Sequence, residues 1–77
     1  MAVQVKIFGQ LTEIINSHEL TLTDISDTNS LINELNKRYP LLSGSRYIVA
    51  VNKQTITANT VLNDDSVVAL LPPFSGG

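Results

Sequence analysis

The residues with the clearest chemical potential stand at the end of the chain, where Pro72-Pro73 is followed by Phe74, Ser75 and Gly76-Gly77. Glycine has no Cβ, so a Gly-Gly end can pass through a channel too narrow for other residues. Two consecutive prolines remove two backbone donors and fix φ, which predicts an extended segment that projects from the preceding strand. From Pro72 to Gly77 such a segment spans on the order of 20 Å. We therefore expect a tail that can reach into the active site of a partner.

The reactive group of this tail would be the terminal carboxylate of Gly77. A carboxylate is a poor acyl donor, but joining it to AMP from ATP gives a mixed anhydride, and a sulfur nucleophile can displace the AMP to leave a thiocarboxylate. The carrier itself needs no acid, base or metal for this chemistry. A frayed end without function is the ordinary interpretation of a terminal glycine pair. The double proline and the predicted fold favour a functional tail instead.

Other side chains that could do chemistry have simpler explanations. His18 opens a predicted strand and is expected to be a solvated residue rather than a base or metal ligand. Asp64-Asp65, like Asp24 and Asp27, falls in a predicted turn, where aspartate is common. The chain has no cysteine, which excludes disulfides, thiolate metal sites and a cysteine nucleophile. We therefore expect no active site, metal or bound cofactor of its own, and whether the protein counts as an enzyme stays open.

Composition limits the chain to one small domain. Its 77 residues can hold a single core, and a hydrophobic content of 43% favours a folded chain over a disordered one. The net charge is −2 and the basic residues are scattered along the sequence, which gives no basis for nucleic-acid binding. The basic residues are Lys6, Lys37, Arg38, Arg46 and Lys53. The longest apolar run, Val67 to Pro73, is too short to span a membrane, and no secretory signal is visible, so we expect a soluble cytoplasmic protein.

The spacing of apolar residues predicts the elements that must position the tail. In chain order these are strands over 3–7, 19–23, 46–52 and 67–71, a short helix over 11–15 and a long helix from 28 to 39. Asp27 or Thr28 is expected to cap the long helix, and Pro40 to end it. Ile56 and Val61 hint at a short extra strand in a polar connection.

This element order predicts an α+β fold of the β-grasp, ubiquitin-like kind. One long helix, with a short one beside it, would cover a mixed sheet of four to five strands. The first two strands would pair as a hairpin-like unit, and the last strand would insert beside the first in parallel. We expect a β-grasp domain over residues 1–71 and an extended tail over residues 72–77.

Phe8 is the one aromatic residue on the polar face of the first predicted strand. It falls in phase with Gln4 and Lys6 rather than with the apolar residues between them. Aromatic residues on polar faces are favoured anchors for partner docking, so Phe8, Leu71 and Phe74 are predicted to form a patch around the root of the tail. The alternative is that the short helix covers Phe8.

Four segments give the chain a family resemblance. They are Val5-Lys6-Ile7-Phe8-Gly9, Arg38-Tyr39-Pro40, Val49-Ala50-Val51-Asn52 and the ending from Val68 to Gly77. In these segments the chain resembles the small sulfur-carrier subunits of molybdopterin synthase, which are ubiquitin-like proteins related to the carriers of thiamine synthesis. The family often has Gly-Asp where this chain has Asp65-Ser66.

The resemblance implies a function in molybdenum cofactor biosynthesis. An E1-like activating enzyme would use ATP to adenylate Gly77, which would then be converted to a thiocarboxylate. The tail would enter the large synthase subunit and donate sulfur to cyclic pyranopterin monophosphate. The family also implies a heterotetramer of two carriers and two large subunits.

Two other functions remain open from the sequence. A sulfur carrier for thiamine synthesis also ends in Gly-Gly on a β-grasp domain, but it lacks the segment that Pro72-Pro73 forms here. A ubiquitin-like protein could instead be an interaction module, or a modifier joined to lysines of other proteins through Gly77. Lysine conjugates would indicate a modifier, whereas a thiocarboxylate would indicate a carrier.

Overall fold

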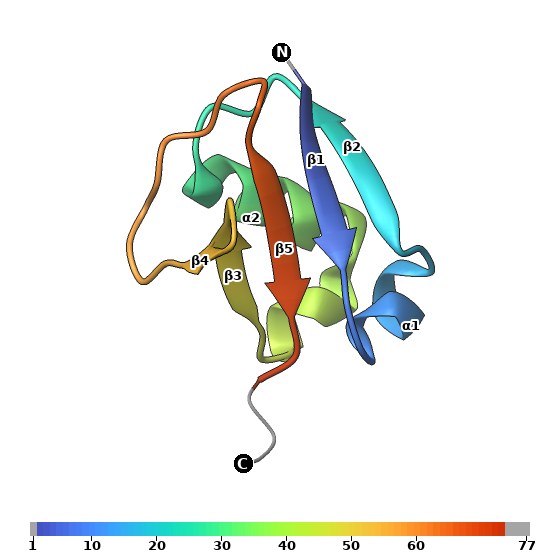
Figure 1. The fold of residues 1–77 in the computed structure, drawn as a ribbon. Coiled ribbons are helices and arrows are strands. Elements are labelled where there is room, and N and C mark those ends of the chain that lie inside the picture. The colour runs from blue at the N-terminus through green and yellow to red at the C-terminus, as the bar shows by residue number, and fades with distance from the viewer. Residues whose placement is uncertain (1, 74–77) are drawn as a thin grey trace.

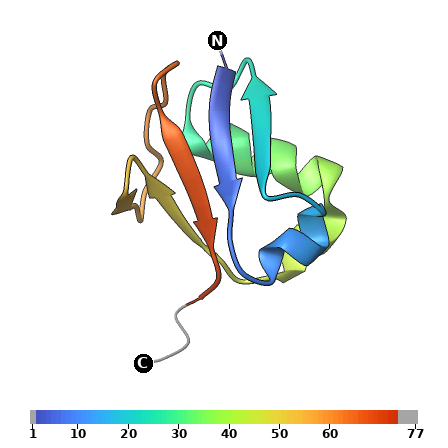
Figure 2. The same ribbon diagram turned by 45° about the vertical axis from the view of Figure 1, so that its right-hand side comes forward.

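A five-stranded mixed sheet forms one layer of the molecule, and the long helix α2 crosses one face of it (Figures 1 and 2). The computed structural model describes residues 2–73, so the predictions for Phe74, Ser75, Gly76 and Gly77 lie outside the described residues. In chain order the elements are β1 (Ala2–Ile7), α1 (Leu11–Ile15), β2 (Glu19–Thr23), α2 (Thr28–Arg38), the 3-10 helix η1 (Pro40–Gly44), β3 (Ile48–Val51), β4 (Gln54–Thr55) and β5 (Val67–Leu71).

The strands lie in the order β2-β1-β5-β3-β4. β1 pairs with β2 and β3 pairs with both β4 and β5 in antiparallel fashion, whereas β1 and β5 are parallel. The predicted β-grasp topology is therefore confirmed, including the parallel insertion of the last strand beside the first. Because β5 is the middle strand, the tail leaves from the centre of the sheet and not from its edge (Figure 1).

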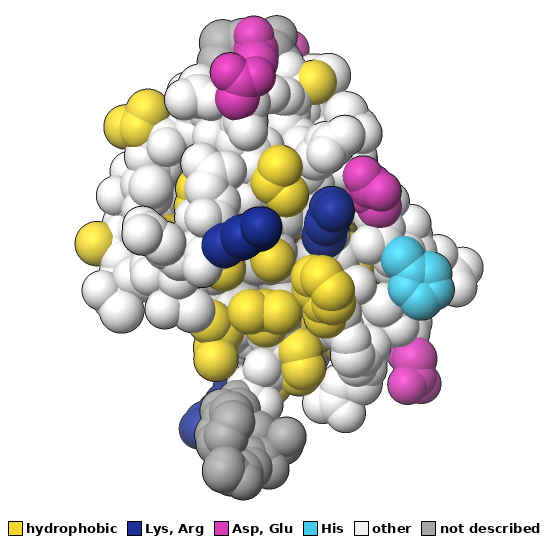
Figure 3. Space-filling model, viewed as in Figure 1, with side chains coloured by type: hydrophobic (Ala, Val, Ile, Leu, Met, Phe, Trp, Pro, Cys, Tyr) yellow, Lys and Arg dark blue, Asp and Glu magenta, His cyan; other side chains and the backbone are white. Residues whose placement is uncertain are grey.

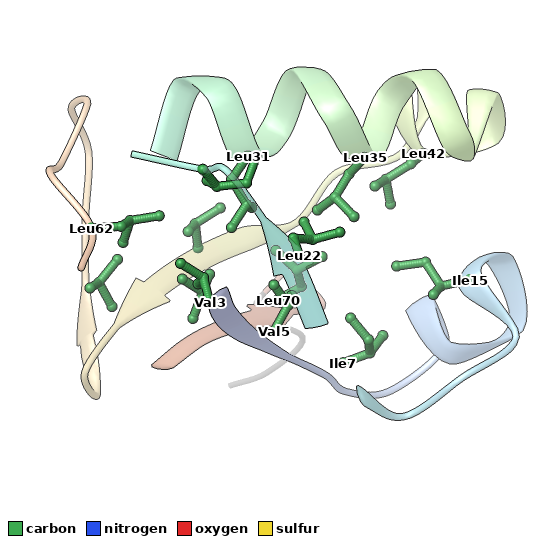
Figure 4. Packing of buried hydrophobic residues seen from close by; sticks show 14 of the residues in the cluster. Val3, Val5, Ile7, Ile15, Leu22, Leu31, Leu35, Leu42, Leu62 and Leu70 are labelled. Atoms are coloured by element: carbon green, nitrogen blue, oxygen red, sulfur yellow. The ribbon is translucent and has the colours of Figure 1, made fainter. Parts of the chain in front are cut away.

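The core lies between the sheet and α2. Along β1 every second residue is buried, and β5 alternates buried with half-buried residues, as strands with one covered face require. Figure 4 shows Leu31 and Leu35 of α2 pointing toward Val3, Val5 and Leu70 of the sheet. All of these side chains are fully buried. Burying an aliphatic side chain stabilises the folded state by about 1.5–3 kcal/mol, so this layer contributes strongly to the stability of the fold.

The ends of α2 follow the sequence signals. Asp27 is the N-cap, and its Oδ1 accepts a hydrogen bond of 2.9 Å from the backbone N–H of Ser30. At the other end Pro40 stops α2, as predicted, but the chain then continues into η1, which the sequence analysis did not anticipate. Proline is tolerated in the first turn of a helix because its missing N–H would be unpaired there.

The connection between β3 and β5 differs from its prediction. β3 is shorter than the predicted strand over 46–52. The predicted extra strand is β4, which ends directly before Ile56, and the backbone N–H of Ile56 still donates to the carbonyl of Val49 at 3.0 Å. Val61 is 79% exposed and makes an isolated bridge with Asp27, whereas the neighbouring Leu62 is buried. Local pattern could not identify Leu62 as a core residue, because its burial depends on contacts with distant elements.

The predicted turn before β5 is closed by side-chain hydrogen bonds. Ser66 is buried, and its Oγ accepts from the backbone N–H of Asn63 at 3.0 Å. The Asn63 side chain in turn accepts from the backbone N–H of Asp65 at 2.9 Å. Asp65-Ser66 therefore forms a well-bonded turn where the resembling family often has Gly-Asp.

Candidate functional site

The root of the tail is held by strands on both sides. The backbone N–H of Phe8 donates to the carbonyl of Leu70 at 3.0 Å, so the pairing of β1 with β5 continues one residue beyond β1. On the other side Leu71 pairs with Ile48 of β3. Since facing residues in a sheet point to the same side, Phe8, Leu71 and Ile48 form an apolar row across three strands where the tail begins.

This row belongs to a larger apolar surface on the sheet face that α2 leaves uncovered. We call this surface the sheet patch, and it consists of Phe8, Ile48, Val67, Ala69 and Leu71. Figure 3 looks onto it and shows hydrophobic side chains gathered over β5 and its neighbours. Phe8 is 44% exposed and the other members are half-buried. The alternative in which the short helix covers Phe8 is therefore wrong, while the docking role of Phe8 and Leu71 stays a prediction.

Gly9 contacts the first residue of the tail. Its φ is +61°, and a Cβ built on it would lie 2.8 Å from Cγ of Pro72, closer than real Cβ contacts come. The segment after β1 therefore has to carry a glycine where it passes Pro72. Nothing in the sequence around Gly9 indicates that residue 72 lies beside it.

Pro73 lines a hollow between the tail and α1. Its other members are Gln10, Leu11, Glu13, Ile14, Ser45 and Arg46. Pro73 is itself exposed. Arg46 thus lies near the root of the tail, where its cation could meet a partner that receives the tail.

A second hollow lies on the sheet patch itself. It is lined by Lys6, Phe8, Asn52, Lys53, Val67 and Ala69. Lys6 and Lys53 are 47 positions apart in the sequence, but β5 brings β1 and the β3–β4 turn to the same face. The basic residues are scattered along the chain, and the fold brings two of them to this hollow.

Away from the tail, a further hollow lies between the start of α2 and β3. Among its lining residues are Ile32, Tyr47, Ile48 and Ile56. None of its lining residues is charged. Partial burial raises the pKa of the Tyr47 phenol, which therefore stays protonated at neutral pH. We find no feature of this hollow that connects it to the chemistry of the tail.

Within residues 2–73 no group of three or more His, Cys, Asp or Glu side chains could hold a metal ion. Over the same residues no helix is both long and apolar enough to cross a membrane. His18 directly precedes β2 and lines none of the three hollows.

The sequence from residue 5 to residue 77 matches the ThiS family. The chain belongs to the ThiS family. The residues that match the ThiS family include both the β-grasp domain and the Gly-Gly ending. The match extends through the tail, including the residues that the structure does not describe.

Solved structures with the same fold include subunits of molybdopterin-converting factor and small archaeal modifier proteins. Subunit 1 of molybdopterin-converting factor from Helicobacter pylori, solved in complex with subunit 2, is 31% identical over 100% of both chains, with a TM-score of 0.76. The small archaeal modifier protein 1 from Methanosarcina acetivorans is 27% identical over 99% of this chain and 96% of its own, with a TM-score of 0.82. A chain from Pyrococcus furiosus shares the fold at a TM-score of 0.84, with 24% identity over 95% of this chain and 98% of its own.

Together, the family match and these likenesses define the class of the protein. It is a β-grasp protein of the class that contains sulfur carriers and ubiquitin-like modifiers.

Proposed function

We propose that this ThiS-family protein is the sulfur carrier of molybdenum cofactor biosynthesis. An ATP-dependent, E1-like enzyme joins AMP to the carboxylate of Gly77 with release of pyrophosphate. A sulfur nucleophile then displaces AMP, and the carrier leaves with a C-terminal thiocarboxylate. Within molybdopterin synthase the sulfur passes to cyclic pyranopterin monophosphate, and two carriers act with two large subunits.

The observation that carries this proposal is the arrangement at the end of β5. The middle strand of the sheet leads directly into Pro72 and Pro73, and the partly exposed sheet patch extends to this point through Phe8 and Leu71. A partner that binds the patch would therefore also receive the tail. The likeness to a subunit solved together with subunit 2 of molybdopterin-converting factor supports a large synthase subunit as that partner.

Reconstitution with the cognate enzymes tests the proposal in two stages. The purified protein is incubated with the activating enzyme, ATP and a sulfur donor, and intact-mass spectrometry is expected to show one oxygen replaced by sulfur. Addition of the large subunit and cyclic pyranopterin monophosphate is then expected to yield molybdopterin. Absence of any thiocarboxylate in the first stage would refute a carrier function. A thiocarboxylate without molybdopterin would refute only the pathway.

A ubiquitin-like modifier is the second candidate, because a small archaeal modifier protein shares 27% identity with nearly the whole chain. A modifier would use the same adenylated Gly77, but a lysine amine would displace AMP and form an isopeptide bond. Protein isolated from its native cells distinguishes the two functions. Conjugates that leave Gly76-Gly77 on target lysines after proteolysis would favour the modifier.

A sulfur carrier for thiamine synthesis is the remaining alternative within the ThiS family. Pro72 and Pro73 argue against it, because they stiffen the start of the tail and must fit the partner that receives it. The thiocarboxylated protein can be offered in parallel to the large molybdopterin synthase subunit and to a thiazole-forming enzyme. We expect loss of sulfur only in the first reaction.

A further inference from the structure

Lys6 and Lys53 line the hollow on the sheet patch. No acidic residue is among the residues that line this hollow. Phe8, Val67 and Ala69 supply the apolar part of that lining. Figure 3 shows cationic side chains set among hydrophobic ones on this face, with acidic side chains toward the margins of the view. The arrangement is notable because the protein is acidic overall, with a net charge of −2.

The positions of the other charged groups make this grouping more specific. Glu19 faces Lys6 in the β1–β2 register, yet the ion pair found within residues 2–73 joins Arg38 and Glu34 of α2. Lys6 and Lys53 are both exposed, so a surface that binds the sheet patch can bring carboxylates to their ammonium groups. Such carboxylates would form ion pairs that the isolated domain lacks at this hollow.

We propose that the sheet patch docks onto a protein surface with an apolar centre flanked by carboxylates, which pair with Lys6 and Lys53. This inference rests on the proposed function, and the partner is the large subunit of molybdopterin synthase. Charge complementarity selects an acidic partner surface. Continuity with Leu71 and Pro72 selects the subunit that receives the tail, since the patch and the tail root share β5.

The two kinds of contact have different consequences for binding. The apolar row supplies most of the affinity, because buried aromatic and aliphatic anchors dominate interface energies. The lysines orient the carrier and speed the encounter, and their effect is screened by salt. Loss of both pairs is expected to weaken binding by about tenfold to a hundredfold at low salt. That loss should shrink as the ionic strength rises.

Binding of the full-length carrier to the large subunit tests the inference. Calorimetry or surface plasmon resonance is carried out across a range of salt concentrations with wild type, Lys6→Gln/Lys53→Gln and Lys6→Glu/Lys53→Glu. The matched control is Lys37→Glu on the exposed side of α2, which changes the net charge by as much as the double Gln variant does, but away from the patch. Circular dichroism checks that each variant is folded.

Zero-length crosslinking provides an independent readout. A carbodiimide joins a lysine amine to a carboxylate only when the two are in direct contact. We expect mass spectrometry to find Lys6 and Lys53 joined to Asp or Glu residues of the large subunit, and Lys37 not joined.

The outcomes separate this inference from the proposed function. Weaker, less salt-dependent binding by the Gln variant, still weaker binding by the Glu variant and unchanged binding by Lys37→Glu would support it. Unchanged binding by both double variants would overturn it and leave the proposed function standing. If the wild-type carrier does not bind the large subunit even at low salt, both the acidic docking surface and the proposed partner are wrong.

Discussion

Gly9 and Pro72 show how a single residue can control the direction of the tail. Any side chain at position 9 must adopt a φ of +61° and must also displace Cγ of Pro72. The left-handed conformation alone costs a non-glycine residue about 1–2 kcal/mol. The main effect on the carrier would be a shifted tail root.

The Gly9→Ala variant tests this contact. We expect its free energy of unfolding to fall by about 1–2 kcal/mol in denaturant titrations, together with slower thiocarboxylate formation. Gly44→Ala is the control, because a Cβ at Gly44 would meet nothing within 4 Å. Equal stability of the two variants would show that Gly9 is not constrained by Pro72.

The last two residues are expected to act only in chemistry. Gly76→Val adds a branched side chain to the segment that must enter a narrow channel. We predict loss of molybdopterin formation with an unchanged melting temperature, and the same result when one residue is added after Gly77. A lower melting temperature in either variant would mean that the tail also contributes to the fold, against the tail-specific interpretation.

At the scale of elements, α2 is tied to the long connection before β5. The Asn59 side chain accepts from the backbone N–H of Asn29 at 2.8 Å and from Thr28 Oγ1 at 3.2 Å, and it donates to Asp27. Thr28 Oγ1 also accepts from the backbone N–H of Thr60 at 2.9 Å. These bonds hold a segment with little regular structure against the start of the helix, so the β3–β5 connection has a defined course.

Asp27 makes this junction sensitive to acid. Hydrogen bonds from Ser30, and then from Asn59, lower the pKa of its carboxyl below the ordinary value of 3.8. Because the pKa of Asp27 is lower in the folded state, its ionised carboxylate stabilises the fold fully above about pH 3.8. This stabilisation is lost as the pH falls through the lowered pKa of the folded state. Asp27→Ser keeps a capping oxygen that does not titrate.

We predict that the melting temperature of the wild type falls more steeply than that of Asp27→Ser as the pH is lowered from about 5 to about 2. This range is chosen because an aspartate carboxylate takes up its proton within it. Parallel thermal melts in matched buffers measure the difference. Asp24→Ser provides a control, because Asp24 lies in the preceding turn and does not cap α2. Parallel pH curves for the wild type and Asp27→Ser would contradict the assignment.

At the scale of the whole molecule, one face of the sheet is covered by α2 and the other presents the sheet patch and the tail root. This division separates stability from partner binding. Substitutions on the open face should therefore change binding without unfolding the domain, whereas substitutions in the layer of Leu31 and Leu35 should unfold it.

Phe8→Ser tests the division. Because Phe8 is 44% exposed, we expect little change in melting temperature, but at least about tenfold weaker binding to the large subunit, as for an aromatic anchor at an interface. Val61→Ser is the control, since Val61 is 79% exposed and lies in the connection before β5. Equal binding by both variants would remove Phe8 from the docking surface.

Much of this architecture was predictable from the sequence alone. Alternation along β1, helical spacing along α2, the cap at Asp27 and the stop at Pro40 are local signals, each set by the chemistry of neighbouring residues. The order of these elements was enough to predict the β-grasp fold. The local composition of the ending predicted an extended, thin tail, whereas the chemistry proposed for Gly77 rests also on the family resemblance.

Only the tertiary structure showed which distant residues meet. Gly9 lies against Pro72, Lys53 joins Lys6 on the sheet patch, and Leu62 enters the core. The first two results depend on the insertion of β5 between β1 and β3, which brings together residues that are far apart in the chain. A periodic pattern reveals which side of an element is buried, but not which other element covers it. For this reason the sequence predicted a tail, whereas the fold determined the surface and the charges that surround its root.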